Sequence, residues 1–195
     1  MKITALAPWY GSKRTLAPRI VHQLGPHSAY HEPFCGSMAV LFAKPACRHE
    51  VVNDLNRDLV NVAEVLKLRP LAADLLVRLH FTICAEEVYR ESKAVVLNPF
   101  HGRLGDVDRA YHAMVTWWMG RNGMAGTRKS RTSFSARFTS KGGSGSVRFR
   151  NLVSSVPAFT KRLAGVDVLN RDALEWLKKI PDEAGTAIYV DPPYL

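Results

Sequence analysis

The sequence has few cysteines and no long apolar run, and these absences exclude several classes of protein. Its three cysteines, Cys35, Cys47 and Cys84, form no Cys-x-x-Cys pair. This argues against a disulfide framework or a zinc site and for a reducing compartment. No segment approaches the roughly 18 to 20 apolar residues of a transmembrane helix, and the N-terminus lacks the apolar run of a secretory signal. We therefore expect a cytoplasmic protein that is not associated with membranes and holds no metal.

Acidic residues are missing from one long segment. Between Arg109 and Val166 the sequence has eleven Lys or Arg residues and no Asp or Glu, whereas the rest of the chain has 16 basic and 17 acidic residues. The whole excess of positive charge is therefore local. A basic segment interspersed with Gly, Ser, Thr and Phe is typical of a nucleic-acid-binding surface, although a solvated loop has the same composition.

The patterns of apolar residues predict an α/β protein with an insertion. Short apolar runs at residues 28–34, 50–53, 166–169 and 186–190 predict strands, and helical periodicity follows the first three. Residues 70–119 show helical periodicity alone. With 195 residues the chain is long enough for one compact domain and a modest insertion. We expect a parallel sheet into which a mainly helical module is inserted.

Local signals predict where several helices begin. Four residues with side chains that can cap a helix precede helical patterns: Thr15, Asn56, Asp106 and Asp172. Trp117 and Trp118 lie on a periodic helix and are expected in the core. Residues 120–150 lose this periodicity, which predicts a hairpin of residues 133–139 paired with residues 146–150.

Three short segments are typical of a nucleotide-binding α/β site. Gly11 and Lys13 lie in a loop just before a helix, a position that favours anionic ligands. A strand followed by Gly36 in a small-residue turn and then a helix lets the backbone approach a nucleotide-like ligand closely. Asp54 stands 18 positions later at the tip of the next strand, where α/β folds bind ribose hydroxyls.

The segment Asp191-Pro192-Pro193-Tyr194 directly follows an apolar strand and carries the strongest chemical signal. Its prolines fix the backbone and lack N–H groups, so Asp191 and the Pro192 carbonyl can both accept hydrogen bonds from one small group. Tyr194 offers a flat face for stacking. Two acceptors on the exocyclic amine of a planar base expose its lone pair and stabilise the positive charge that develops as it attacks a methyl donor. A turn with a buried aspartate is the simpler interpretation.

Four motifs in this order resemble the Dam-type (D12 class) family of DNA adenine N6 methyltransferases. They are Trp9-Tyr10-Gly11-Ser12-Lys13, Glu32-Pro33-Phe34-Cys35-Gly36-Ser37, Asn53-Asp54-Leu55-Asn56 and Asp191-Pro192-Pro193-Tyr194. The resemblance implies a Rossmann-like sheet, S-adenosylmethionine as cofactor and double-stranded DNA as partner. It also implies a cofactor-binding part of the catalytic domain at residues 1–66, an inserted target-recognition domain at residues 67–155, and the part with the Asp-Pro-Pro-Tyr motif at residues 156–195.

The resemblance further implies roles for individual residues. The implied cofactor-binding residues are Trp9, Lys13, Phe34, Gly36, Ser37, Asp54, Asp172 and Asp191. Asp191, Pro192 and Tyr194 are the implied catalytic residues, acting on an adenine that must first leave the stacked duplex. Asn122, Arg128, Lys129 and Arg131 are the candidates for contact with DNA.

The sequence departs from the family pattern at three places. Met38 and Ser12 replace common glycines, and both replacements fit if the local backbone has negative φ. In the family the sheet continues past the Asp-Pro-Pro-Tyr strand. We therefore expect that the chain is truncated after this motif and its sheet incomplete. Otherwise a second chain completes the sheet, or the protein is a remnant with impaired activity. A monomer is the alternative to assembly with a second chain, and the exposed strand edge would lower solubility.

The chemistry leaves alternatives open. Cytosine N4 methylation uses similar acceptors, and RNA also offers phosphates. A non-catalytic DNA-binding remnant of the fold is the alternative from another class. Cytosine C5 methylation is disfavoured because the sequence has no Pro-Cys dipeptide, and a dinucleotide oxidoreductase because the turn lacks three glycines. A restriction-modification enzyme, a phage protection enzyme and a regulatory methyltransferase are all compatible with these motifs.

Overall fold

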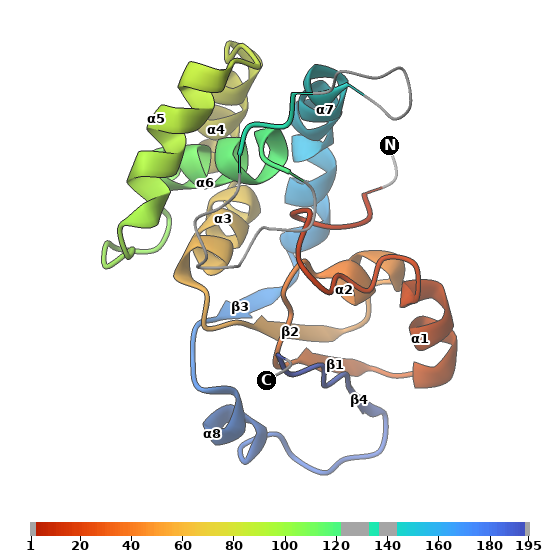
Figure 1. The fold of residues 1–195 in the computed structure, drawn as a ribbon. Coiled ribbons are helices and arrows are strands. Elements are labelled where there is room, and N and C mark those ends of the chain that lie inside the picture. Colours follow the sequence, from red (N-terminus) through yellow and green to blue (C-terminus); the bar gives the residue numbers. More distant parts are fainter. Residues whose placement is uncertain (1–2, 122–132, 137–143, 194–195) are drawn as a thin grey trace.

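The computed structural model of the chain describes residues 3–121, 133–136 and 144–193 (Figure 1). Its centre is a four-stranded parallel sheet with the order β3-β2-β1-β4. The strands are β1 (Ala29–Glu32), β2 (His49–Asn53), β3 (Asp167–Leu169) and β4 (Thr186–Ile188). The predicted parallel α/β architecture is confirmed. Because all strands run the same way, the segments that follow them meet at one edge of the sheet.

Three helices connect or flank the strands: α1 (Ala17–Leu24), α2 (Ala39–Ala43) and α8 (Ala173–Leu177). Five more form a helical layer that lies above the sheet in the view of Figure 1. They are α3 (Arg57–Lys67), α4 (Arg69–His80), α5 (Glu86–Leu97), α6 (Val107–Met119) and α7 (Gly145–Leu163). Helix α6 is central to this layer, because it packs against α3, α4, α5 and α7.

Three of the four predicted helix caps are confirmed. The side chains of Asn56, Asp106 and Asp172 accept hydrogen bonds from backbone N–H groups in the first turns of α3, α6 and α8. The prediction for Thr15 is wrong, since Leu16 is the residue before α1 and makes no side-chain cap. To cap the helix, the Thr15 side chain would have to accept a hydrogen bond from the N–H of residue 17 or 18. The Ala17 N–H is donated to the Lys13 carbonyl, and residue 18 is a proline.

The predicted hairpin is also wrong, because residues 146–150 belong to helix α7. The buried residues of α7 recur every three or four positions: Phe149, Leu152, Val153, Val156, Phe159 and Leu163. This stripe starts where the predicted strand ended, so the helical period becomes visible only over residues 149–163. Of the proposed partner strand, residues 137–139 lie outside the described part, and Phe134 makes only an isolated bridge with Gly120.

Helix α7 returns the chain from the helical layer to the sheet. The domain boundary predicted after residue 155 falls inside this helix. Trp117 is buried and Trp118 packs against the core, which confirms their predicted packing role.

Strand β4 is an edge strand of the described sheet, with β1 as its neighbour. Ile188 in β4 and Val190 just after it are 40% and 49% exposed, which agrees with the expected apolar edge. In the described part of the chain, no helix combines the length and the apolar character needed to cross a membrane.

Candidate active site

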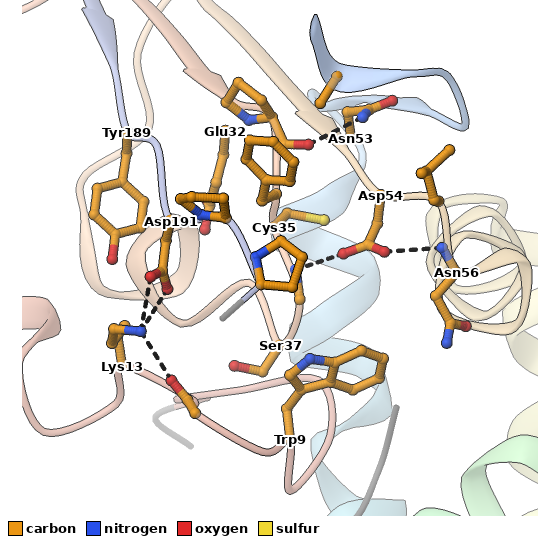
Figure 2. A pocket seen from close by; sticks show the side chains of 18 of the residues that line it. Trp9, Lys13, Glu32, Cys35, Ser37, Asn53, Asp54, Asn56, Tyr189 and Asp191 are labelled. Carbon is orange, nitrogen blue, oxygen red and sulfur yellow. Dashed lines mark hydrogen bonds and ion pairs between the residues drawn. The ribbon is translucent and has the colours of Figure 1, made fainter. Parts of the chain in front are cut away.

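A cavity of about 620 Å³ opens at the edge of the sheet where the strands end (Figure 2). It is lined by the loop before α1, the turn after β1, the residues after β2, the start of α8 and the segment after β4. Small-molecule sites have this size and this position in open α/β sheets.

The structure brings the described members of the predicted site together. The predicted residues that line the cavity are Trp9, Lys13, Phe34, Gly36, Ser37, Asp54, Asp172, Asp191 and Pro192. The predicted residues Tyr194, Asn122, Arg128, Lys129 and Arg131 lie outside the described residues. Segments from both ends of the sequence therefore share one cavity.

Asp54 is held at the cavity edge by backbone N–H groups. The Gly36 N–H donates to Oδ2 at 2.9 Å, and the Asn56 N–H donates to Oδ1 at 2.8 Å. Burial raises the pKa of Asp54, and these N–H groups oppose that shift because they favour the charged form. The two bonds fix the orientation of the carboxylate relative to the turn after β1.

Gly36 allows an indole ring to pack directly on this turn. Its φ is +44°, and a Cβ at this position would lie 3.2 Å from Cδ1 and Nε1 of Trp9. The Trp9 ring also packs edge to face against the ring of Trp117 in α6, with centroids 6.2 Å apart. Trp9 is thus held as one wall of the cavity by the turn and by the helical layer.

The loop before α1 is tied to the segment after β4 by an ion pair. Lys13 Nζ donates to both carboxylate oxygens of Asp191, at 2.6 and 2.9 Å, and to the Gly11 carbonyl at 3.2 Å (Figure 2). The Ser12 and Ser37 hydroxyls lie 2.7 Å apart and join the same loop to the turn after β1. These contacts close the first loop over one side of the cavity.

Glu32 lines the cavity but was not predicted as a site residue. It is 2% exposed and accepts a hydrogen bond from the Tyr30 hydroxyl at 2.9 Å. Burial raises the pKa of Glu32 to about 8, and the nearby Asp191 charge adds to this shift, whereas the Tyr30 hydroxyl and Lys44 oppose it. The signal in the sequence that could have indicated Glu32 is its position as a carboxylate at the end of a buried strand.

Asn53 joins the ends of three strands beneath the cavity. Its amide donates to the carbonyls of Pro33 and Arg171 at 3.0 Å and accepts from the Arg171 N–H at 2.9 Å. The residue is 1% exposed. A buried side chain with all these partners fixes the relative positions of the turns that follow β1, β2 and β3.

The condition of a negative φ is not met at Met38. Its φ is +57°, and it is the one non-glycine residue of the described part with a positive φ. The side chain is fully buried in the core. Ser12, by contrast, does not have a positive φ. In the first loop the positive φ, +72°, is at the preceding Gly11.

Part of the basic segment faces inward. Arg109 and Arg162 form ion pairs of 2.5 Å with Asp58 and Glu50. Arg148 donates to two backbone carbonyls at the end of α6. These three charges stabilise the fold, so counting charges in the sequence overstates the charge available to a nucleic acid.

Comparison with known proteins agrees with this geometry. The sequence profile of the family described as D12 class N6 adenine-specific DNA methyltransferase matches residues 9–195. The chain belongs to this family. A curated relative of this D12 class protein is the Type II methyltransferase M1.LlaDCHI of Lactococcus lactis subsp. cremoris, 25% identical over 195 residues. The match covers 96% of this chain and 64% of that relative, so the chain spans less than two thirds of the relative's length.

Proposed function

We propose that this D12 class protein is a site-specific DNA methyltransferase that transfers a methyl group from S-adenosylmethionine to the N6 amino group of adenine in duplex DNA. The observation that carries the proposal is the shared cavity of Asp54 and Asp191, which follow strands on opposite sides of β1. One cavity can therefore take a nucleoside cofactor at one end and a target base at the other. The same proposal makes duplex DNA the partner and the cytoplasm the location.

The residues of the cavity fit the proposed cofactor. Gly36 and Trp9 form a cradle that a side chain at position 36 would fill, and Asp54 offers carboxylate oxygens to ribose hydroxyls. Leu55 and Leu174 line the cavity although they are 66% and 64% exposed, which suits a purine ring lying against them. Phe34, Ser37 and Asp172 would complete the binding site. The bound cofactor would supply an electrophilic methyl group on a sulfonium.

Asp191 and the Pro192 carbonyl are the proposed acceptors for the target amine. Each carboxylate oxygen has more than one acceptor position, so Asp191 can bind an N–H group while it stays paired with Lys13. When Asp191 and the Pro192 carbonyl accept hydrogen bonds from the amine, its nitrogen becomes more nucleophilic. The carboxylate then stabilises the positive charge that develops on the nitrogen. Lys13 orients this carboxylate, because its ammonium group contacts both carboxylate oxygens. The adenine must be extruded to reach it.

The substitution Asp191→Asn tests the proposal. Transfer of a labelled methyl group to duplex DNA should fall by about 10²- to 10³-fold, because the charge that stabilises the reacting amine is removed. Asp182→Asn is the matched control, since Asp182 is an exposed acid in the loop before β4, and it should keep wild-type activity.

The nucleosides of the treated DNA identify the product. N6-methyladenine is the expected result. Finding only N4-methylcytosine would replace the adenine assignment by cytosine chemistry. Salt-sensitive DNA binding without any methyl transfer by the wild-type chain would contradict the enzymatic proposal and support the non-catalytic remnant.

A further inference from the structure

A largely exposed aromatic side chain stands at the mouth of the cavity. Tyr10 lines the cavity, and 69% of its surface is exposed. The adjacent Trp9, in contrast, packs on Gly36 and against Trp117. Because Tyr10 lines the cavity and leaves most of its ring uncovered, the ring can stack on a planar group that enters there.

A tight turn fixes the position of Tyr10. The Ser12 N–H donates to the Trp9 carbonyl at 3.2 Å, and Gly11 has φ +72°, which matches a type II β-turn with Tyr10 at its second position. The residues on both sides are anchored, Trp9 on the Gly36 turn and Ser12 through its hydroxyl contact of 2.7 Å with Ser37. The ring therefore starts from a backbone that is already ordered, which lowers the entropic cost of binding.

Lys13 places this turn beside the proposed catalytic carboxylate. Its ammonium group lies 3.2 Å from the Gly11 carbonyl and 2.6 Å from Asp191. The exposed leucines of the cavity, Leu55 and Leu174, instead come just after Asp54 and Asp172 in the chain. Since β2 and β4 lie on opposite sides of β1, the Lys13 contact links the turn of Tyr10 to the side of the target amine, whereas the leucines follow acids on the side of the cofactor.

We propose that Tyr10 stacks on the target base after its extrusion from the duplex and so holds the base in the cavity mouth beside Asp191. This inference rests on the proposed function. Stacking of a base on an aromatic side chain tolerates any base, so Tyr10 would contribute affinity for the extruded ring and leave the choice of base to Asp191 and Pro192.

The test uses the full chain and two duplexes. The methylated sequence is first located by mapping the label in plasmid DNA. One duplex then contains that sequence, and the other has an abasic site in place of the target adenine. Dissociation constants are measured for the wild type, Tyr10→Ala and Tyr10→Phe. Phe81→Ala is the matched control, because Phe81 is an exposed aromatic (81%) at the end of α4.

Tyr10→Ala should weaken binding of the adenine duplex by about 5- to 150-fold, the range for one base stacked on an aromatic ring. On the abasic duplex it should equal the wild type, because the ring has no base to meet. Tyr10→Phe and Phe81→Ala should remain close to the wild type on both duplexes.

Three results would overturn the role of Tyr10. They are an unchanged affinity in Tyr10→Ala, an equal loss on both duplexes, which would indicate contact with flanking DNA, and a parallel loss of S-adenosylmethionine affinity in calorimetry. Failure of the proposed function is a separate outcome. It appears in the wild type alone, as DNA that gains no N6-methyladenine.

Discussion

At the scale of single residues, burial decides the behaviour of the carboxylates around the site. Asp54 and Glu32 lie at the ends of neighbouring strands, and burial is the largest cause of the raised pKa of each. Asp54 receives backbone N–H groups from Gly36 and Asn56 that stabilise its charge. Glu32 accepts hydrogen bonds from the Tyr30 hydroxyl and from the backbone of Leu41, yet burial still raises its pKa to about 8. The two carboxylates thus share burial as the main cause of a raised pKa and differ in the hydrogen bonds that oppose it.

Glu32 makes the stability of the fold depend on pH. Its pKa rises from an ordinary value of 4.5 to about 8 in the folded protein. Between these values the folded state holds a proton that the unfolded chain has released. The contribution of Glu32 to the free energy of unfolding should therefore be fully present below the unfolded pKa and fall by up to about 1.4 kcal/mol per pH unit until the pH passes the folded pKa.

Glu32→Gln should remove this contribution, because the amide can accept from Tyr30 but does not titrate in this range. Urea unfolding at about pH 5 and about pH 7 measures the difference. The exposed acid Glu183, changed to Gln, is the control and should keep the wild-type pH dependence. The same pH dependence in Glu32→Gln and in the wild type would show that Glu32 does not hold this proton in the folded protein.

At the scale of elements, the turn between β1 and α2 combines two unusual backbone conformations. Gly36 has φ +44°, and Met38 has φ +57° as the residue before α2. A side chain in the left-handed region costs about 1 to 2 kcal/mol, whereas loss of a buried methionine side chain costs about 2 to 5 kcal/mol. Packing of Met38 therefore outweighs the strain, which explains how this turn tolerates a residue other than glycine.

This balance predicts that at position 38 the Gly variant is more stable than the Ala variant, the reverse of their order inside a helix. Met38→Gly and Met38→Ala should both destabilise the protein, since both leave a cavity, but Gly should be the more stable by about 1 kcal/mol because it relieves the left-handed strain. Met114, equally buried but inside α6, is the matched control, and there Ala should exceed Gly by about 1 kcal/mol. Chemical unfolding of the four variants gives the comparison. The ordinary order at both positions would refute the strain at Met38.

At the scale of the whole molecule, the charge of the basic segment is divided between the interior and its exposed surface. Arg109, Arg148 and Arg162 bind groups of the protein. Arg121, Arg150 and Lys161 are exposed. We propose that the exposed charges and the residues Arg128, Lys129 and Arg131 together attract the DNA backbone.

Replacement of Arg128, Lys129 and Arg131 by glutamine should weaken duplex binding and make its salt dependence flatter, by up to about one unit of slope for each DNA phosphate that is no longer neutralised. Affinity for S-adenosylmethionine should stay the same, because the described residues that line the cavity come from other segments. The control replaces Arg69, Arg78 and Arg90 of α4 and α5 in the same way. A parallel loss of cofactor affinity would show that the basic segment belongs to the cofactor site.

The features that could be predicted from the sequence depend on residues close together in the chain. Apolar runs indicated the four strands, and Asn56, Asp106 and Asp172 capped their helices because a cap needs only N–H groups two or three positions away. The turn motifs indicated the cavity residues in the same way, while the resemblance to a family supplied their roles.

The remaining features depend on contacts between distant segments and on backbone dihedrals. Lys13 meets Asp191 across 178 positions, Arg109 and Arg162 turn inward to acids on other elements, and Met38 adopts a left-handed conformation. Strands, caps and motifs were thus set by the sequence itself, since neighbouring residues determine them. The pairing of charges, the strain at Met38 and the presence of Tyr10 and Asp191 in one cavity were decided only by the tertiary structure, because packing brings together groups whose separation along the chain carries no information about their distance in space.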